Sequence, residues 1–498
     1  MKFHSGILIL IFLGIAFAQP PDVDTRYHTY QEVLDELETI TSSYPTICLM
    51  ETLGVSTTDS VPIIGVKVSA DVSFSENKIS VLIIAGQHAR EVQGPEVVMW
   101  LINYLVENYG SDTQVTQWLD SLLIYFIPVN NPEGHNVVMQ ESSFHTTFWR
   151  KTKRDNNHNG VFDTLYDGVD PNRNYEFLWD EYTDSIGVSP ESEYYKGPYP
   201  WSENEVVVVR NLVDSLRPSV VLDLHSPDSI KGNKLWFCWY DPELSTYHQE
   251  GFPHYLNVAN QLADNTETEI DGEYYESTPA YNTKPKLQLW TYWYSGCCAI
   301  LMEITNQCYW TGEIIDTISA RVGRGIFYIF DRMLESGLVV KAFDSESGNP
   351  LRAEIIVEEV TDTTFPPRLC NYEGIYHRLL YNGTYNVIVR YDTLEQIFED
   401  LPIESGHNTY LEVDFPGAKI NTTIRSKNEV DILLLPSKAV CIAPKGKVEI
   451  FDIAGKTVYR NMFKNHLEIR RDRLPAGVYF IKLSSGSETI KRKFIGLK

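Results

Sequence analysis

The sequence lacks three features that would each point to a familiar class of protein. After the N-terminus, none of its 498 residues belong to an apolar run long enough to span a bilayer. The seven cysteines form no CxxC pair, so the spacing typical of a structural zinc site is missing. Positive charge is scarce, and the formal net charge of −25 argues against nucleic acid as a partner, because phosphate would be repelled.

The N-terminus has the pattern of a secretory signal. A lysine precedes a short apolar run that ends in Ala16, Phe17 and Ala18, an arrangement similar to an A-x-A cleavage site. We therefore expect residues 1–18 to be a signal peptide and the mature chain to be exported without a transmembrane span. An uncleaved anchor is the less favoured alternative, because the run is short for a bilayer.

Hydrophobic patterning predicts an α/β domain over residues 19–335. Apolar strands such as ISVLIIA (79–85) and VVLDLH (220–225) alternate with helical patterns such as PEVVMWLINYLVENYG (95–110). Near-continuous apolar strands separated by helices are typical of a mostly parallel mixed sheet flanked by helices. The segment SENEVVVVRNLVDSL (202–216) predicts a further helix that is capped by its serine and has glutamate at the third position.

Two small β-sandwich modules are predicted to follow, over residues 336–416 and 417–498, because short strands there alternate with turns. Within the second module, residues 443–498 hold 13 Lys or Arg against 5 Asp or Glu, a net charge of +8 on an acidic protein. This asymmetry indicates a separate module with its own partner. A solvated, lysine-rich β-domain without a partner is the alternative.

Chemically reactive residues gather at the carboxyl ends of two predicted strands. The segment GQHAREVQGPE (86–96) follows one strand and contains His88 and Glu91, whereas His225 ends another. Ligands bind beyond the carboxyl ends of strands in open parallel sheets. Two imidazoles and one carboxylate match a catalytic zinc site that keeps a position open for water. Each residue alone is more often structural, so the hypothesis depends on further residues.

Four such residues are present. Glu303 lies inside the apolar strand AILMEI, where a carboxylate is costly unless something compensates it, either a metal-activated water or an ion pair with arginine. Arg150 occurs in FWRKTKR, and Asn172 and Arg173 occur in GVDPNRNYEF. Arginine can grip a carboxylate through two hydrogen bonds or stabilise an oxyanion beside a metal. Singly, each arginine is more often a solvated charge.

The motifs HARE, VNNPEG, FWRKT, GVDPNRN, YKGPYPWSE, LDLHS and MEIT occur in the order seen in zinc carboxypeptidases of the carboxypeptidase A type, over roughly 300 residues. The chain resembles bacterial, carboxypeptidase T-like members of this family. The resemblance implies an enzyme that hydrolyses the C-terminal peptide bond of peptides and proteins. It also implies one Zn²⁺ per chain, held by His88, Glu91 and His225.

The resemblance also implies roles for the other residues. Glu303 aligns with the family's catalytic glutamate, and Arg150 aligns with its oxyanion-stabilising arginine. Asn172 and Arg173 align with the pair that binds the substrate's terminal carboxylate. These last two residues argue against a zinc amidase acting on internal bonds of cell-wall peptides, which offer no adjacent carboxylate. The presence of Glu303 and Arg150 argues against a non-catalytic surface adhesin.

The resemblance implies roles for three further positions, of which Tyr281 and Gln288 align by spacing. Tyr281 fits the family's mobile tyrosine, although its context STPAYNTKPK differs from the usual one, and Arg90 would contact residues upstream of the scissile bond. Gln288 aligns with the position that selects the C-terminal side chain. Because Gln is neutral and its neighbours LQLWTYWY are apolar and aromatic, a preference for large neutral residues is expected.

The remaining modules also resemble known ones. Residues 336–416 are similar to the carboxypeptidase regulatory-like sandwich. The motifs VEIFDIAGKTVY, LPAGVYFIKL and KRKFIGLK resemble the C-terminal sorting domain of type IX secretion, which implies a secretion machinery as partner and a secreted or cell-surface protein. Residues 154–160, RDNNHNG, alternate Asp and Asn as at the start of a Ca²⁺ loop, and a solvated polar loop is the simpler alternative.

Overall fold

The protein is described here from a computed structural model. The described residues are 23–140, 148–226, 232–239, 252–280, 284–361, 363, 365–416, 431–434, 438–452, 456–470, 477–485 and 488–496. The predicted signal peptide and Tyr281 lie outside these ranges.

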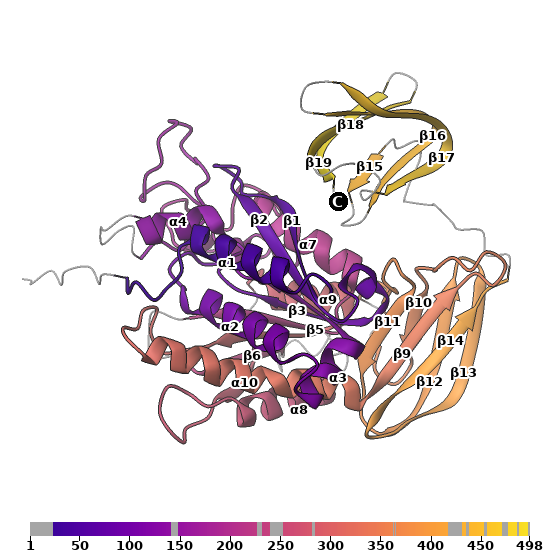
Figure 1. Ribbon diagram of the computed structural model, residues 1–498, viewed down its shortest axis with the longest axis horizontal. Helices are drawn as coiled ribbons and strands as arrows, with labels where there is room; N and C mark the ends of the chain where they lie inside the picture. Colours follow the sequence, from indigo (N-terminus) through magenta and orange to yellow (C-terminus); the bar gives the residue numbers. More distant parts are fainter. Residues whose placement is uncertain are drawn as a thin grey trace, which may run out of the picture.

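The first region is built on an eight-stranded mixed sheet with strand order β1-β2-β4-β3-β5-β8-β6-β7. Figure 1 labels β1, β2, β3, β5 and β6 of this sheet. Four of its seven pairings are parallel, among them those that join β4, β3, β5 and β8 in the middle. The fold prediction of a mostly parallel mixed sheet is therefore confirmed. The strands are β1 (Cys48–Val55), β2 (Pro62–Val68), β3 (Ile79–Ile84), β4 (Leu122–Ile127), β5 (Val220–His225), β6 (Lys234–Trp239), β7 (Glu276–Ala280) and β8 (Cys298–Glu303).

Helices cover both faces of the sheet because the central strands are apolar on both faces. In β3, Val81 and Ile83 belong to one hydrophobic core, and Leu82 and Ile84 belong to another. The first core packs under α1 (Tyr30–Ser43), α2 (Gln93–Asn108), α3 (Thr113–Ser121), α8 (Phe252–Asn265) and α10 (Ile314–Glu335). The second packs under α7 (Asn204–Leu216) and α9 (Leu287–Ser295). Figure 1 shows α1 and α2 in front of the sheet.

The sheet topology brings the predicted site residues to one edge. His88 follows β3, His225 ends β5 and Glu303 ends β8, and these three strands are parallel neighbours. In the register of β5 and β8, His225 lies directly opposite Glu303. The carboxyl ends of parallel neighbours meet at the same edge, so residues that are far apart in the chain come together.

One local prediction differs from the structure. The helix predicted from Ser202 begins at Asn204, and its N-cap is Glu203 without a side-chain cap. The serine cap is wrong because the Ser202 hydroxyl donates to Glu203 and Glu205 accepts hydrogen bonds from Thr57 instead. The motif VNNPEG leads into α4 (Pro132–Gln140), whose first residue is a proline; the N–H that proline lacks has no partner within the helix at this position.

Smaller elements complete the first region. They are the 3-10 helices η1 (Val72–Asn77) and η2 (Pro171–Arg173) and the short helix α6 (Ser185–Val188). The five cysteines whose side chains are described, at positions 48, 297, 298, 308 and 370, are buried. Among the described residues, no helix has the length and hydropathy needed to cross a membrane.

Residues 336–416 form two three-stranded sheets around one hydrophobic core, as the β-sandwich prediction requires. One sheet has the order β10-β12-β13 and the other β11-β9-β14. The strands are β9 (Ser336–Phe343), β10 (Glu354–Val357), β11 (Ile375–Leu379), β12 (Gly383–Tyr391), β13 (Leu394–Ile403) and β14 (His407–Asp414). The domain boundaries and the likeness to a regulatory module stay predictions.

The last described segments form a five-stranded antiparallel sheet. Its central strand pairs with three others and carries the buried residues Val448 and Ile450. The strands are β15 (Asp431–Leu434), β16 (Lys438–Asp452), β17 (Thr457–Arg470), β18 (Gly477–Ser485) and β19 (Glu488–Gly496).

A test of the backbone around the site uses Gly168. It has a φ of +82°, and a Cβ there would lie 2.4 Å from the Thr152 carbonyl oxygen. Gly168→Ala should therefore lower the free energy of unfolding by about 2–5 kcal/mol, the sum of overpacking and a left-handed backbone. Gly110 has the same φ of +82° and nothing within 4 Å, so Gly110→Ala should cost only about 1–2 kcal/mol.

Differential scanning calorimetry on both variants separates the two contributions, because only Gly168 adds the steric clash. Equal shifts of the unfolding transition for the two variants would contradict the close packing of residues 149–152 against Gly168.

Candidate metal centre

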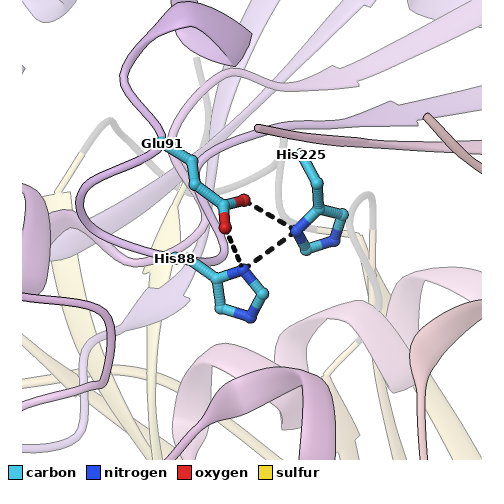
Figure 2. Close-up of side chains that lie close together, drawn as sticks. All are labelled: His88, Glu91 and His225. Atoms are coloured by element: carbon cyan, nitrogen blue, oxygen red, sulfur yellow. Dashed lines mark hydrogen bonds and ion pairs between the residues drawn. The ribbon is translucent and has the colours of Figure 1, made fainter. Parts of the chain in front are cut away.

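His88, Glu91 and His225 converge on one point at the carboxyl edge of the sheet (Figure 2). One ligand atom from each of these buried residues lies within 4.8 Å of the others. Glu91 bridges the two rings, with one carboxylate oxygen 2.8 Å from Nδ1 of His88 and the other 2.8 Å from Nδ1 of His225. The two Nδ1 atoms are 2.9 Å apart. Among the described residues, this is the group of His, Cys, Asp or Glu that could hold a metal ion.

The local backbone explains why His88 and Glu91 point to the same place. Gly86 has a φ of +64°, which lets the chain turn sharply where β3 ends. The Glu91 N–H then donates to the His88 carbonyl at 3.1 Å, so the two residues sit on one tight turn before α2. This turn aims both side chains at the end of β5, where His225 stands.

The outer nitrogen of each imidazole is held by a carboxylate. Nε2 of His88 lies 3.1 Å from Asp170, and Nε2 of His225 lies 2.8 Å from Asp223. Asp223 in turn accepts a hydrogen bond from the Gln87 amide at 2.6 Å. Carboxylates in this position fix the tautomer and orientation of metal-binding histidines, leaving the other nitrogen as the ligand.

The buried donors and their surroundings therefore fit zinc. Two Nδ1 atoms and one carboxylate face a common centre, a set that zinc accepts in sites with an open coordination position. Both outer nitrogens are already occupied, so the ring orientation needs no rearrangement to receive a cation. His88, Glu91 and His225 are the residues that would hold the ion.

The charged groups packed around the centre shift the pKa values of its ionisable residues. Burial alone would raise the pKa of Glu91, but His88 and His225 hold it well below its ordinary value. Burial alone would lower the pKa of His225, but Asp223 and Glu91 raise it to about 10. Burial and the positive charge of Arg150 lower the pKa of His88. Positive charge is thus favoured between the rings.

Asp170 connects the metal centre to Arg150. Nε and Nη2 of Arg150 donate to the same Asp170 oxygen at 3.1 and 2.9 Å, and Nη1 approaches Glu91 at 3.4 Å. Burial would raise the pKa of Asp170, but Arg150, Arg173 and His88 hold it well below its ordinary value. The guanidinium is thereby fixed beside the metal ligands.

The backbone brings these two residues together. The Thr152 N–H donates to the Val169 carbonyl at 2.9 Å, and the Gly168 N–H donates to the Arg154 carbonyl at 2.8 Å. The segments that carry Arg150 and Asp170 therefore run side by side, although they are separated in the chain by the polar loop that begins at 154.

Asn172 and Arg173 lie on η2, at the same edge. The Asn172 amide nitrogen is 3.3 Å from Nε2 of His225, and its oxygen accepts a hydrogen bond from the Leu287 N–H at 2.8 Å. Asn172 thus satisfies an N-terminal amide of α9, which the helix cannot satisfy itself. Arg173 donates to the Asn172 carbonyl at 2.6 Å, while its buried Nε has no partner among the described residues.

Glu303 stands opposite His225 but is not among the three converging ligands. Its Oε2 is buried and has no hydrogen-bond partner within the described part of the chain. Burial and the negative charge of Glu91 raise its pKa to about 7, against the opposing effect of His225, Lys286 and Arg150. A carboxyl group of this kind can exchange a proton near neutral pH.

The remaining predicted residues are less closely joined to the centre. Arg90 forms a two-pronged ion pair with Glu193, at 3.1 and 3.2 Å. Gln288 is fully buried in the first turn of α9, with neither amide atom bonded to a described residue. Tyr281 lies outside the described residues, so its position is not assigned.

The Asp- and Asn-rich loop directs its carboxylates at its own backbone. Asp155 accepts from the N–H groups of Asn159 and Gly160, and Asp163 accepts from those of Leu165 and Tyr166. These bonds give the loop its shape without an ion, and the calcium hypothesis gains no support.

Asp170 and Asp223 were not singled out from the sequence, yet both hold imidazole rings of the candidate metal centre. A signal for Asp223 is present, since an aspartate two residues before a histidine interrupts the apolar strand VVLDLH. Asp170 lies in GVDPNRN but is joined to His88 only by the fold, across 82 residues.

The metal assignment predicts that His225→Ala removes most bound zinc, because one of three ligands is lost. Asp223→Asn keeps the ligand but weakens its orientation, and should lower zinc affinity by about 10–100-fold. Zinc content by mass spectrometry and affinity by competition with a chelator measure both effects. A His225→Ala protein that still binds one zinc per chain with unchanged affinity would contradict the ligand set.

Comparison with known proteins agrees with this geometry. Residues 33–316 match the model of the family described as zinc carboxypeptidase. The chain is 32% identical over 203 residues to carboxypeptidase A2 of Rattus norvegicus, covering 40% of this chain and 44% of the relative. It is 34% identical over 227 residues to carboxypeptidase B of Helicoverpa zea, covering 44% and 48%. The chain thus spans about half the length of these curated relatives.

Solved structures share the fold. The crystal structure of thrombin activatable fibrinolysis inhibitor superposes with a TM-score of 0.52 at 22% identity, covering 61% of this chain and 73% of that one. Carboxypeptidase A from Helicoverpa armigera gives a TM-score of 0.50 at 19% identity, covering 61% and 72%.

A second family model, described as a secretion system C-terminal sorting domain, matches residues 421–497 and indicates export to the cell surface or beyond. The first match contains more than half of the chain and all three converging residues. The protein therefore belongs to the zinc carboxypeptidase family.

Proposed function

We propose that the protein is a secreted zinc-dependent carboxypeptidase that hydrolyses the last peptide bond of peptides and proteins. The observation that carries the proposal is the convergence of His88, Glu91 and His225 beside a second group, Asn172 and Arg173, suited to a terminal carboxylate. A metal site alone fits many hydrolases, whereas a carboxylate-binding group next to it favours the chain end as substrate.

The metal ligands prepare the site for hydrolysis. Zinc held by these three residues would supply Lewis acidity, which polarises the peptide carbonyl and lowers the pKa of a water molecule toward about 7. Asp170 and Asp223 hold the outer nitrogen of each imidazole, which orients the other nitrogen of each ring toward the ligand position.

Glu303 has the properties of the general base. Its carboxyl group is buried at the end of β8, is not one of the converging ligands, and has a pKa raised to about 7. It would accept the proton of the attacking water and pass it to the leaving amine. Groups whose pKa lies near the working pH are the most effective in such transfers.

Arg150 is suited to stabilise the negative oxygen of the tetrahedral intermediate. Its guanidinium is buried, and two of its nitrogens already donate to Asp170, which fixes its orientation. A positioned donor in a site shielded from water costs little reorganisation during the reaction.

Arg173 and Asn172 would bind the free carboxylate of the substrate. The buried Nε of Arg173 has no partner among the described residues, so a donor is available for an incoming anion. Because the pair sits beside His225, a carboxylate held there places the adjacent peptide bond at the metal. Arg90 is proposed to contact residues upstream of that bond, and Tyr281 to close over the substrate.

We further propose that the C-terminal module docks to a secretion machinery. The match to a sorting-domain model and the net charge of +8 over residues 443–498 support this. This positive net charge distinguishes the module from an otherwise acidic chain, as expected for a part with its own partner.

The role of Glu303 can be tested with Glu303→Gln, which keeps the size of the side chain and removes the proton acceptor. Turnover should fall by about a hundredfold or more, while zinc content stays unchanged, because general-base catalysis contributes on this scale. Glu412→Gln, at an exposed position of β14, serves as the matched control. Either zinc loss or near-normal turnover in Glu303→Gln would exclude the assignment.

The secretion proposal predicts the fate of a truncated chain. In a host with the matching secretion system, deletion of residues 431–498 should leave active enzyme in the periplasm, because the sorting module is gone. Fractionation followed by an activity assay measures this, with the full chain as control. Efficient release of the truncated enzyme into the medium would refute the proposal.

A further inference from the structure

Two lysines lie beside the carboxylate-binding pair, and the proposed reaction gives neither a role. Lys286 is the N-cap residue of α9, directly before Leu287, whose N–H donates to Asn172 at 2.8 Å. Lys284 lies two residues earlier, with its ammonium 5.4 Å from the centre of the Tyr182 ring and 5.7 Å from that of Tyr194. Both side chains are partly buried.

Three cations surround one tyrosine ring at this place. The guanidinium carbons of Arg150 and Arg173 lie 5.2 and 5.5 Å from the centre of the Tyr194 ring, and the Lys284 ammonium lies 5.7 Å from it. This local excess of positive charge stands out in a chain with a formal net charge of −25. Like charges held close together raise the energy of the site unless anions compensate them.

Asp170 is already paired, and Glu303 acts on Lys286 only through its charge, without an ion pair between them among the described residues. Both oxygens of Asp170 are occupied, one by His88 and the other by Arg150. Among the described residues, neither Lys284 nor Lys286 forms an ion pair. Burial, with repulsion from Arg173, lowers the pKa of Lys286 to about 7, and Glu303 only partly opposes this. Burial also lowers the pKa of Lys284.

Gln288 adds an independent observation. Its side chain is fully buried one position into α9, and both its amide oxygen and its amide nitrogen lack a partner in the described part of the chain. A buried amide without hydrogen bonds costs folding free energy, so such a group often forms its hydrogen bonds with a bound polar ligand. It also lies at the positive end of the helix dipole of α9, which favours an anion.

We infer that Lys286, assisted by Lys284 and Gln288, selects substrates whose C-terminal residue carries a side-chain carboxylate, namely glutamate or aspartate. Arg173 and Asn172 would bind the main-chain carboxylate, and the α9 N-terminus would bind the second one. The inference rests on the proposed carboxypeptidase function. This acidic preference differs from the preference for large neutral residues that Gln288 alone predicts. The prediction from the sequence did not take the two lysines into account.

The sharpest test compares peptides that end in Glu and in Gln, which differ in charge and hardly in shape. For the zinc-loaded wild-type enzyme, kcat/KM should be higher for Glu by about tenfold or more, the scale of one charge-assisted hydrogen bond. Peptides ending in Leu and Lys complete the series. This comparison needs no variant and therefore does not depend on the folding of one.

Lys286→Met then removes the ammonium and keeps the length of the side chain. The Glu-to-Gln ratio of kcat/KM should fall by about tenfold, while the value for the Leu peptide changes little. Lys341→Met, at an exposed position of the mostly buried strand β9, removes the same charge at a distance and should leave the ratio unchanged. Zinc content and the unfolding temperature of each variant are measured in parallel.

Each outcome decides between the proposals. If Leu- or Gln-ending peptides are hydrolysed as well as or better than the Glu peptide, the carboxypeptidase function stands and the acidic preference is wrong. If Lys286→Met lowers kcat/KM equally for all peptides, Lys286 acts on Glu303 and not on the substrate side chain, which also overturns the inference. If no peptide is hydrolysed by the zinc-loaded enzyme, the proposed function fails together with the inference.

Discussion

The constraint on which the site depends is the fixed orientation of two buried imidazoles. Asp170 and Asp223 hold the outer nitrogens of His88 and His225, and both inner nitrogens face Glu91. Without these carboxylates, each ring could rotate and bury an unsatisfied nitrogen, which costs free energy. Their negative charge also favours a cation between the rings. The metal centre is therefore already arranged by hydrogen bonds within the protein.

The sheet provides the second constraint. β3, β5 and β8 are parallel and adjacent, so the residues after or at their ends share one edge. The apolar strands pack into cores on both faces, which leaves this edge as the place where polar side chains can meet. The same edge receives η2 and the start of α9, linked by the bond from Leu287 to Asn172. The proposed metal ligands and the proposed carboxylate-binding residues are thus parts of one connected arrangement.

Much of this could be predicted from the sequence because it depends on local patterns. The strand-helix alternation indicated the sheet, and the ends of ISVLIIA and VVLDLH marked His88 and His225. The start of α7 could not be predicted correctly, because Glu205 is bonded to Thr57, 148 residues away. Likewise, the pairing of Asp170 with His88 and the crowding of Lys284 and Lys286 around Arg173 arise only when distant segments are packed together.

The central claim is that the chain acts on free C-termini through a metal centre joined to a carboxylate-binding pair. It is tested most directly by incubating the zinc-loaded protein with peptides in free-acid form and with the same peptides amidated at the C-terminus, followed by mass spectrometry. The account predicts loss of single C-terminal residues from the free acids and none from the amides, since Arg173 needs a carboxylate. Cleavage of internal bonds, or equal trimming of the amidated peptides, would contradict it.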